Sequence, residues 1–194
     1  MATDEFNWLD PLSAMEIAVT QFIIDGGLKY TEKNCARMIN GQPAPRCGMV
    51  FVSVWSPGDV AAGNASTGDP RAAFQESMRV NVTVTRRLEG PWDRWVKHRD
   101  ELKGRCRQIA KLVQRDVIDY SVTNIAKAML GEAVSYGWIE PLTYLGTDAA
   151  QIQGPQWFNA VIDTEGQVDI RDNGVSMTVR FGNGLRIEYA QGND

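Results

Sequence analysis

The chain has 194 residues, of which 43% are apolar, with 20 Lys or Arg, 24 Asp or Glu, three Cys and one His. This composition is typical of one globular domain that is large enough to bury a core without disulfides or a structural metal. A single His excludes a polyhistidine site, and three Cys without paired spacing argue against zinc, so we expect no metal and no cofactor.

The sequence also bears on where the protein folds. It has no run of about 18 apolar residues, and its first residues have neither the basic start nor the apolar core of a signal peptide. We therefore expect folding in the cytosol and no association with a membrane. In that compartment Cys35, Cys47 and Cys106 are expected to be free thiols, with a Cys35–Cys47 disulfide as the alternative.

Charge is distributed unevenly along the chain. Residues 79–115 contain eleven bases and four acids, a local charge of +7, so the other nine bases and twenty acids give −11. A solvated surface explains such asymmetry, but it also suits self-association in which a basic face meets an acidic one.

The first half of the chain predicts a helix and two strands. Pro11 opens an apolar helical pattern that ends at Gly26. Residues 49–56 have the composition of a central strand, and residues 79–88 alternate like an antiparallel strand that is wet on one face. The small polar residues of the segment 57–78 between these strands predict a projecting loop.

Two helices are predicted next. The longer one begins at Pro91, and its apolar stripe includes Trp95, Leu102 and Ile109. A break near residues 119–121 precedes a short helix that ends at Gly131. Both helices are expected to cover one face of the sheet.

The last third of the chain returns to strand patterns around residues 140–145, 157–162, 175–181 and 185–189. Asp172-Asn-Gly174 and Gly182-Asn-Gly184 separate the later segments and predict hairpin turns. We therefore predict a single α+β domain over residues 1–194. It has a mixed, mainly antiparallel sheet, an N-terminal helix, a long plus a short helix on one face, and C-terminal β-hairpins.

No group of residues in the sequence suggests catalysis. His98 lies among charged residues on the polar side of the long helix, and no Gly-x-Ser-x-Gly elbow supplies a nucleophile. Gly182-Asn-Gly184 does not open a helix as a phosphate loop does. The acids of the segment 163–172 match no metal-binding spacing. We predict that the protein is not an enzyme and has no catalytic residues.

The long helix carries the most informative surface. Arg107, Lys111 and Arg115 form an i,i+4 row opposite the apolar stripe, with no acid between them, whereas Glu101 and Arg105 have the spacing of an ordinary ion pair. The row is either a solvated face or a contact with an acidic neighbouring subunit or DNA. Sequence-specific DNA recognition is disfavoured, because the chain is acidic and has no recognition motif.

The element order carries a family resemblance, together with three segments: Val80-Asn-Val-Thr-Val-Thr-Arg-Arg-Leu88, Pro91-Trp-Asp-Arg94 and Gly154-Pro-Gln-Trp-Phe158. The chain resembles tailed-bacteriophage tail terminator proteins, also called tail-completion or neck proteins, from its first helix to its final hairpin. The long insertion at 57–78 and the extra C-terminal strands depart from the smallest members.

The resemblance implies a structural virion protein in the tail or neck, assembled in the host cytoplasm. Its subunits would form a ring, usually a homohexamer, that caps the head-proximal end of the tail tube and ends tube polymerisation. The implied partners are the tail tube protein and a head-side connector or stopper protein. Genomic DNA would pass through the lumen without sequence recognition.

The resemblance also suggests which residues lie between subunits. The loop would become ordered against a neighbour through Asp59, Asn64, Asp69 and Arg71, and the basic row would meet an acidic patch. Two alternatives remain at this stage. One is another neck protein, such as a head-completion protein or stopper, and the other is an accessory module that binds nucleic acid.

Overall fold

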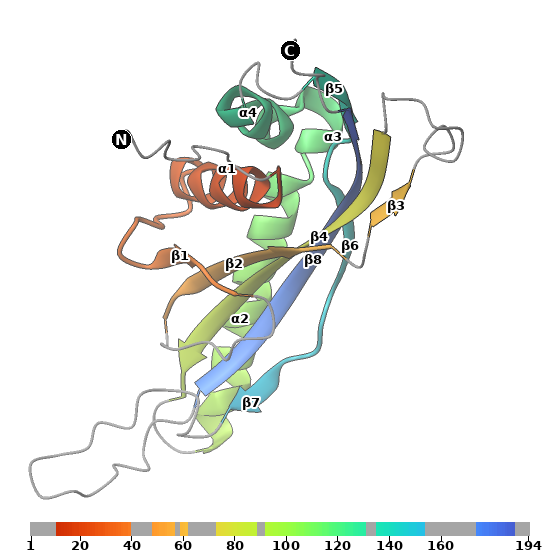
Figure 1. Ribbon diagram of the computed structural model, residues 1–194. Coiled ribbons are helices and arrows are strands. Elements are labelled where there is room, and N and C mark those ends of the chain that lie inside the picture. The colour runs from red at the N-terminus through yellow and green to blue at the C-terminus, as the bar shows by residue number, and fades with distance from the viewer. Residues whose placement is uncertain are drawn as a thin grey trace, which may run out of the picture.

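The computed structural model describes residues 11–39, 48–56, 59–61, 73–88, 92–130, 135–153 and 174–188 (Figure 1). In chain order its elements are α1 (Pro11–Asp25), β1 (Cys35–Arg37), β2 (Val50–Trp55), β3 (Asp59–Ala61), β4 (Ala73–Arg87), α2 (Trp92–Val113), α3 (Asp116–Asp119), α4 (Ser121–Leu130), β5 (Ser135–Ile139), β6 (Thr143–Thr147), β7 (Gln151–Gln153) and β8 (Gly174–Glu188).

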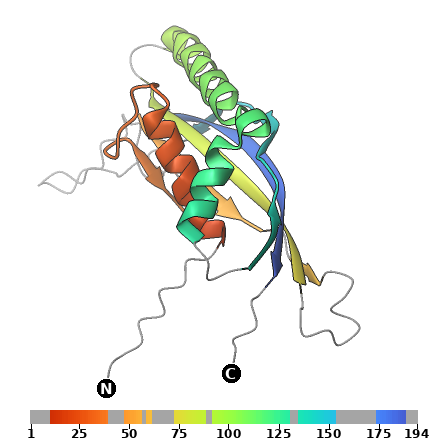
Figure 2. The same cartoon turned by 90° about the horizontal axis from the view of Figure 1, so that it is seen from above.

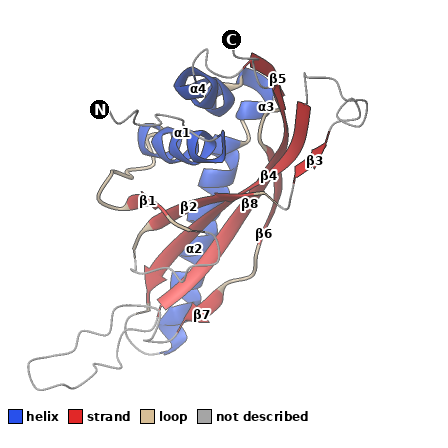
Figure 3. Cartoon of the chain, in the orientation of Figure 1, coloured by secondary structure: helices blue, strands red, loops and turns tan. Residues whose placement is uncertain are grey.

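The fold is the predicted α+β class. Figure 2 shows the helices gathered on one side of the sheet, and Figure 3 shows helices and strands as separate layers. None of the helices in the described ranges combines the length and the apolar character needed to cross a membrane.

Two strands of 15 residues each, β4 and β8, form the centre of the sheet and pair antiparallel over their whole length. β2 and β3 follow one another along the outer edge of β4. β5, β6 and β7 lie end to end along the opposite edge of β8, and β1 runs parallel to β2. The sheet is therefore a long central ribbon flanked by interrupted edge strands.

The loop predicted over residues 57–78 includes residues that belong to strands. β3 takes residues 59–61, and β4 begins at Ala73 instead of residue 79. Asp59–Ala61 pairs with residues 74–76 of β4 and so extends the hydrogen-bond ladder that β2 begins. Backbone pairing along the ribbon thus prevails over the polar composition that predicted a loop. Residues 62–72 lie outside the described residues.

The hairpin turn predicted at Gly182-Asn-Gly184 is wrong, because these residues lie inside β8. Gly182 is paired with Arg79 of β4 and with Thr143 of β6. A Cβ atom at this position would lie 2.5 Å from Nη1 of Arg79 and 2.9 Å from Cδ1 of Leu145. Side chains from both neighbouring strands therefore fill the space above Gly182, and the glycine marks close approach instead of a turn. In the other predicted turn, Asp172 and Asn173 lie outside the described residues.

The core lies between the helices and one face of the sheet. Val80, Val82 and Val84, the apolar positions of the alternating segment 79–88, are buried. The apolar stripe of α2 is buried at Leu102, Cys106, Ile109 and Val113. The opposite face of the ribbon is polar, and Oγ1 of Thr83 on β4 lies 2.9 Å from Oγ1 of Thr178 on β8. This alternation confirms the predicted strand with one apolar and one polar face.

Candidate functional site

The basic row lies on the exposed face of α2 and the turn that follows it. Arg107, Lys111 and Arg115 are all exposed. Arg115 forms an ion pair with Asp119, with 3.4 Å between Nη2 and Oδ2. Arg107 and Lys111 form no ion pair with another described residue. Two of the three charges are therefore open to a partner.

The opposite end of α2 is bound to β4. Arg86 pairs with Glu101 and donates a hydrogen bond from Nε to Nδ1 of His98 at 3.0 Å. The predicted Glu101–Arg105 pair is not formed, and Glu101 pairs with Arg86 instead. Burial raises the pKa of Tyr30, and the charge of Arg105 acts in the opposite direction. His98 is partly buried at its contact with Arg86 instead of being a free surface residue. These bonds hold α2 against the sheet and leave its basic row outward.

A small apolar projection follows the row. Ile118 is 83% exposed, and Val117 and Tyr120 are 45% and 44% exposed. We call these three residues the α3 knob. Tyr120 ends α3 in the left-handed conformation, with φ of 54°. Exposed apolar residues clustered at one turn are typical of an interaction site.

A buried carboxylate supports the knob from below. Asp116 is fully buried, and its Oδ1 accepts hydrogen bonds from the backbone N–H groups of Val122 (2.7 Å) and Thr123 (2.9 Å) at the start of α4. Its Oδ2 accepts from the Thr123 hydroxyl (2.6 Å) and the backbone N–H of Leu142 (2.8 Å). One side chain therefore joins α3, α4 and the segment that leads into β6.

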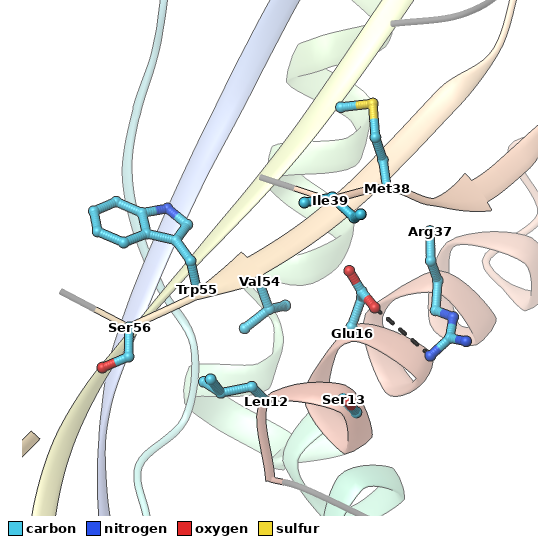
Figure 4. Close-up of a pocket in the computed structure, with 9 residues that line it drawn as sticks. All are labelled: Leu12, Ser13, Glu16, Arg37, Met38, Ile39, Val54, Trp55 and Ser56. Atoms are coloured by element: carbon cyan, nitrogen blue, oxygen red, sulfur yellow. Dashed lines mark ion pairs between the residues drawn. The ribbon is translucent and has the colours of Figure 1, made fainter. Parts of the chain in front are cut away.

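A shallow pocket of about 760 Å³ lies between the first turns of α1 and the ends of β1 and β2 (Figure 4). We call it the α1 pocket; it is lined by Leu12, Ser13, Glu16, Arg37, Met38, Ile39, Val54, Trp55 and Ser56. Ile39 is 78% exposed, so an apolar side chain faces solvent at this pocket.

Glu16 is the acidic group of the α1 pocket. Its Oε2 lies 3.6 Å from Nη1 of Arg37, and its side chain is only 18% exposed. Burial raises the pKa of Glu16, although the charge of Arg37 and a backbone hydrogen bond from Val54 act in the opposite direction. A carboxylate in this position would gain from a further cation.

The loop residues predicted at an interface are mostly outside the described residues. Asn64, Asp69 and Arg71 fall in that undescribed segment, whereas Asp59 begins β3 opposite Glu76 of β4. The acidic residues of the segment 163–172 also lie outside the described residues. In the described ranges, no three His, Cys, Asp or Glu side chains come together in a metal-binding arrangement.

Cys35 and Cys106 are free and buried, whereas Cys47 lies outside the described residues. Burial raises the pKa of Cys35 to about 11 and that of Cys106 to about 12. Because the thiolate is the reactive species, both side chains are inert near neutral pH and serve as core residues.

We expect this inertness in a thiol titration of a Cys47→Ser variant. At pH 8 the folded protein should react with Ellman's reagent at least about 100-fold more slowly than the same variant in urea, where both thiols are released. The measurement is absorbance against time in the two solutions. A folded protein whose two thiols react as fast as in urea would contradict the burial of Cys35 and Cys106.

The chain thus combines an α+β fold with two separate exposed surfaces, the α3 knob with its basic row and the α1 pocket. No family model matches the sequence, and no curated protein sequence matches it.

Proposed function

We propose that this protein is a structural virion protein that forms a ring at the head-proximal end of a phage tail tube. The ring ends tube polymerisation and joins the tail to the head. The observation that carries the proposal is the element order. The structure has a first helix, the paired strands β2 and β4, the helices α2 and α4 and the final strand β8, and the resemblance to tail terminator proteins rests on such an order of elements.

The surfaces support association with further copies. A tube grows because each ring repeats one end-to-end interface, and a capping ring stops growth by matching the tube on one face only. The exposed row of Arg107, Lys111 and Arg115 offers positive charge on a chain whose net charge is −4. An acidic neighbour would pair with it, and several weak contacts in one ring act together.

The proposed partners are further copies of the chain as a homohexamer, the tail tube protein and a head-side connector or stopper protein. DNA would pass the lumen without being read, and the protein would reside in the virion after assembly in the host cytoplasm. A head-completion protein or stopper would form a ring of the same kind elsewhere in the neck. Binding to portal protein would indicate this position, whereas binding to tube protein would indicate a tail terminator.

Negative-stain microscopy of the purified protein, alone and mixed with tail tubes, tests the proposal. We expect rings, and tubes capped at one end. A protein that stays monomeric and leaves tube ends bare would overturn the proposal. The exposed charges of Arg107 and Lys111 favour one competing function, which is the binding of nucleic acid. Salt-dependent binding of DNA by the monomer would support that function instead of the ring.

Charge reversal tests the role of the basic row. The double variant Lys111→Glu/Arg115→Glu should weaken ring assembly by about tenfold or more at low salt, which corresponds to about 1.4 kcal/mol. The loss should shrink at high salt, because screening weakens contacts between exposed charges. Sedimentation velocity at two salt concentrations measures the loss of assembly at low salt and its decrease at high salt.

The control is Lys29→Glu/Lys33→Glu, which changes the net charge equally at two exposed residues in the segment between α1 and β1. It should assemble like the wild type. Unchanged assembly of the α2 variant at low salt would remove the row from the subunit interface.

A further inference from the structure

We infer that the polar face of the central ribbon holds an oxyanion-binding site centred on Arg79, which takes the carboxylate or phosphate group of a ligand. We call it the Arg79 site; it is formed by Trp55, Arg79, Leu145, Arg180 and Gly182. The inference goes beyond the proposed ring and does not depend on it, because all of these residues belong to one chain.

Arg79 lies on the side of the sheet that faces away from the helices. The next residue, Val80, is fully buried in the core, and successive side chains of a strand point to opposite faces of the sheet. Thr83, four residues further along β4, lies on the same face as Arg79 and belongs to its polar surface. Because Figure 2 shows the helices gathered on the other side of the sheet, no described helix covers Arg79.

The guanidinium of Arg79 lacks a counter-charge. Within the described part of the chain it forms no ion pair and no side-chain hydrogen bond. Arg79 is also only partly exposed, so it is incompletely hydrated. A guanidinium is charged at neutral pH, and its five N–H donors match the paired oxygens of a carboxylate or phosphate group. The donors of Arg79 are therefore available to an anion.

The residues around Arg79 supply no acid. Trp55 of β2 and Gly182 of β8 lie directly opposite it on the two neighbouring strands. Ser77 and Asn81 are its nearest neighbours on the same face of β4. An acidic side chain in one of these positions could pair with the guanidinium, but none of the four residues is acidic. The local potential is therefore positive and favours a negatively charged ligand.

Two further groups of this face donate hydrogen bonds. Arg180 is two residues from Gly182 in β8, and its side chain is 51% exposed, although its Nη2 lies 2.8 Å from Oδ1 of Asp148. Figure 4 shows Trp55 and Val54 on opposite sides of β2, which places the indole on the face of Arg79. The Nε1 atom of Trp55 is buried and has no hydrogen-bond acceptor. Neighbouring donors that lack acceptors are an arrangement that an oxyanion would stabilise.

Gly182 makes room for the guanidinium. A Cβ atom there would lie 2.5 Å from Nη1 of Arg79 and 2.9 Å from Cδ1 of Leu145. The head group of Arg79 therefore rests above the backbone of β8, with the side chain of Leu145 beside it. A side chain that is already held in place loses little conformational entropy when it binds a ligand.

Nuclear magnetic resonance titration of the ¹⁵N-labelled full chain tests the site. The probes are sodium phosphate and, separately, sodium acetate, at an ionic strength held constant with sodium chloride. We expect saturable shifts of the Trp55 Nε1–H signal, which a Trp55→Phe variant identifies, with a Kd on the order of 1 mM. Tighter binding of phosphate would assign the site to a phosphoryl group, and tighter binding of acetate would assign it to a carboxylate.

Three variants locate the binding. Arg79→Gln removes the charge and should raise the Kd about tenfold or more. Gly182→Ala keeps the charge but displaces the guanidinium, and should raise the Kd about fivefold or more. The two atoms closest to the new methyl group end flexible side chains, so this variant should fold, which circular dichroism checks. Arg94→Gln is the matched control, because Arg94 is an exposed arginine of α2, and it should bind like the wild type.

The outcomes distinguish this inference from the proposed function. Shifts that do not saturate, wild-type affinity in Arg79→Gln or in folded Gly182→Ala, or an equal loss of affinity in Arg94→Gln would overturn the Arg79 site. None of these results would bear on the ring, which microscopy tests separately.

Discussion

Replacing Asp116 with Asn should lower the free energy of unfolding by about 3 kcal/mol, which is a large part of the stability of an ordinary domain. The carboxylate accepts four hydrogen bonds from three backbone N–H groups and one hydroxyl. An amide has one oxygen, so its NH₂ group would face at least one backbone N–H, with which it cannot pair; only the Thr123 hydroxyl could turn and accept from it. At least one backbone N–H therefore loses its acceptor in a buried site, and the remaining bonds are made to a neutral oxygen instead of a carboxylate.

Urea unfolding followed by circular dichroism measures this loss. Asp119→Asn is the matched control, because Asp119 is exposed and accepts one backbone N–H, from Ser121. The control should lose less than about 1 kcal/mol. If both variants lost the same amount, Asp116 would not be the anchor of α3 and α4.

Replacing Phe181 with Ala should cost about 3–5 kcal/mol, the range found for removing a large buried aromatic side chain. Phe181 is the largest fully buried side chain of the described core. It lies on β8 between Val80 of β4 and Tyr144 of β6, and its ring centroid lies 6.0 Å from that of Tyr144 in an edge-to-face arrangement. The substitution leaves a cavity at the centre of the ribbon, where paired strands on both sides prevent collapse.

The same unfolding experiment tests this prediction, with Leu145→Ala as its control. Leu145 lies next to Tyr144 in β6 but is 47% exposed, so its truncation should change the unfolding free energy by only about 1 kcal/mol. A loss below about 1 kcal/mol for Phe181→Ala would show that the site relaxes around the missing ring. The core would then not depend on this side chain.

The helices were predictable because their signals are local. Pro11 and Gly26 bound α1 in the sequence much as they do in the structure, and the stripe from Leu102 to Val113 identifies the buried face of α2. The central strands were predictable where apolar and polar residues alternate. Gly182 was misread because a glycine needed for close packing has the same appearance as a glycine needed for a turn. Only the register of β4, β6 and β8 distinguishes the two.

The candidate site was predicted in part. The row from Arg107 to Arg115 is exposed as its position opposite the stripe indicates, but the α3 knob and the α1 pocket were missed. One signal was present for the knob. The buried positions Cys106, Ile109 and Val113 continue at the same spacing to Asp116, which places a carboxylate inside and turns the apolar residues after it outward. The α1 pocket is formed by segments that are distant in the sequence, so no local sequence pattern predicts it.

The interrupted edges of the sheet have a consequence for handling the protein at high concentration. β1 and β7 have only three residues each, and the pairing of β5 and β6 with β8 shifts register at Tyr136/Trp138 and Tyr144/Gly146. Short and bulged edges are poor templates for adding a foreign strand. We therefore expect concentrated solutions of the protein to resist fibril formation.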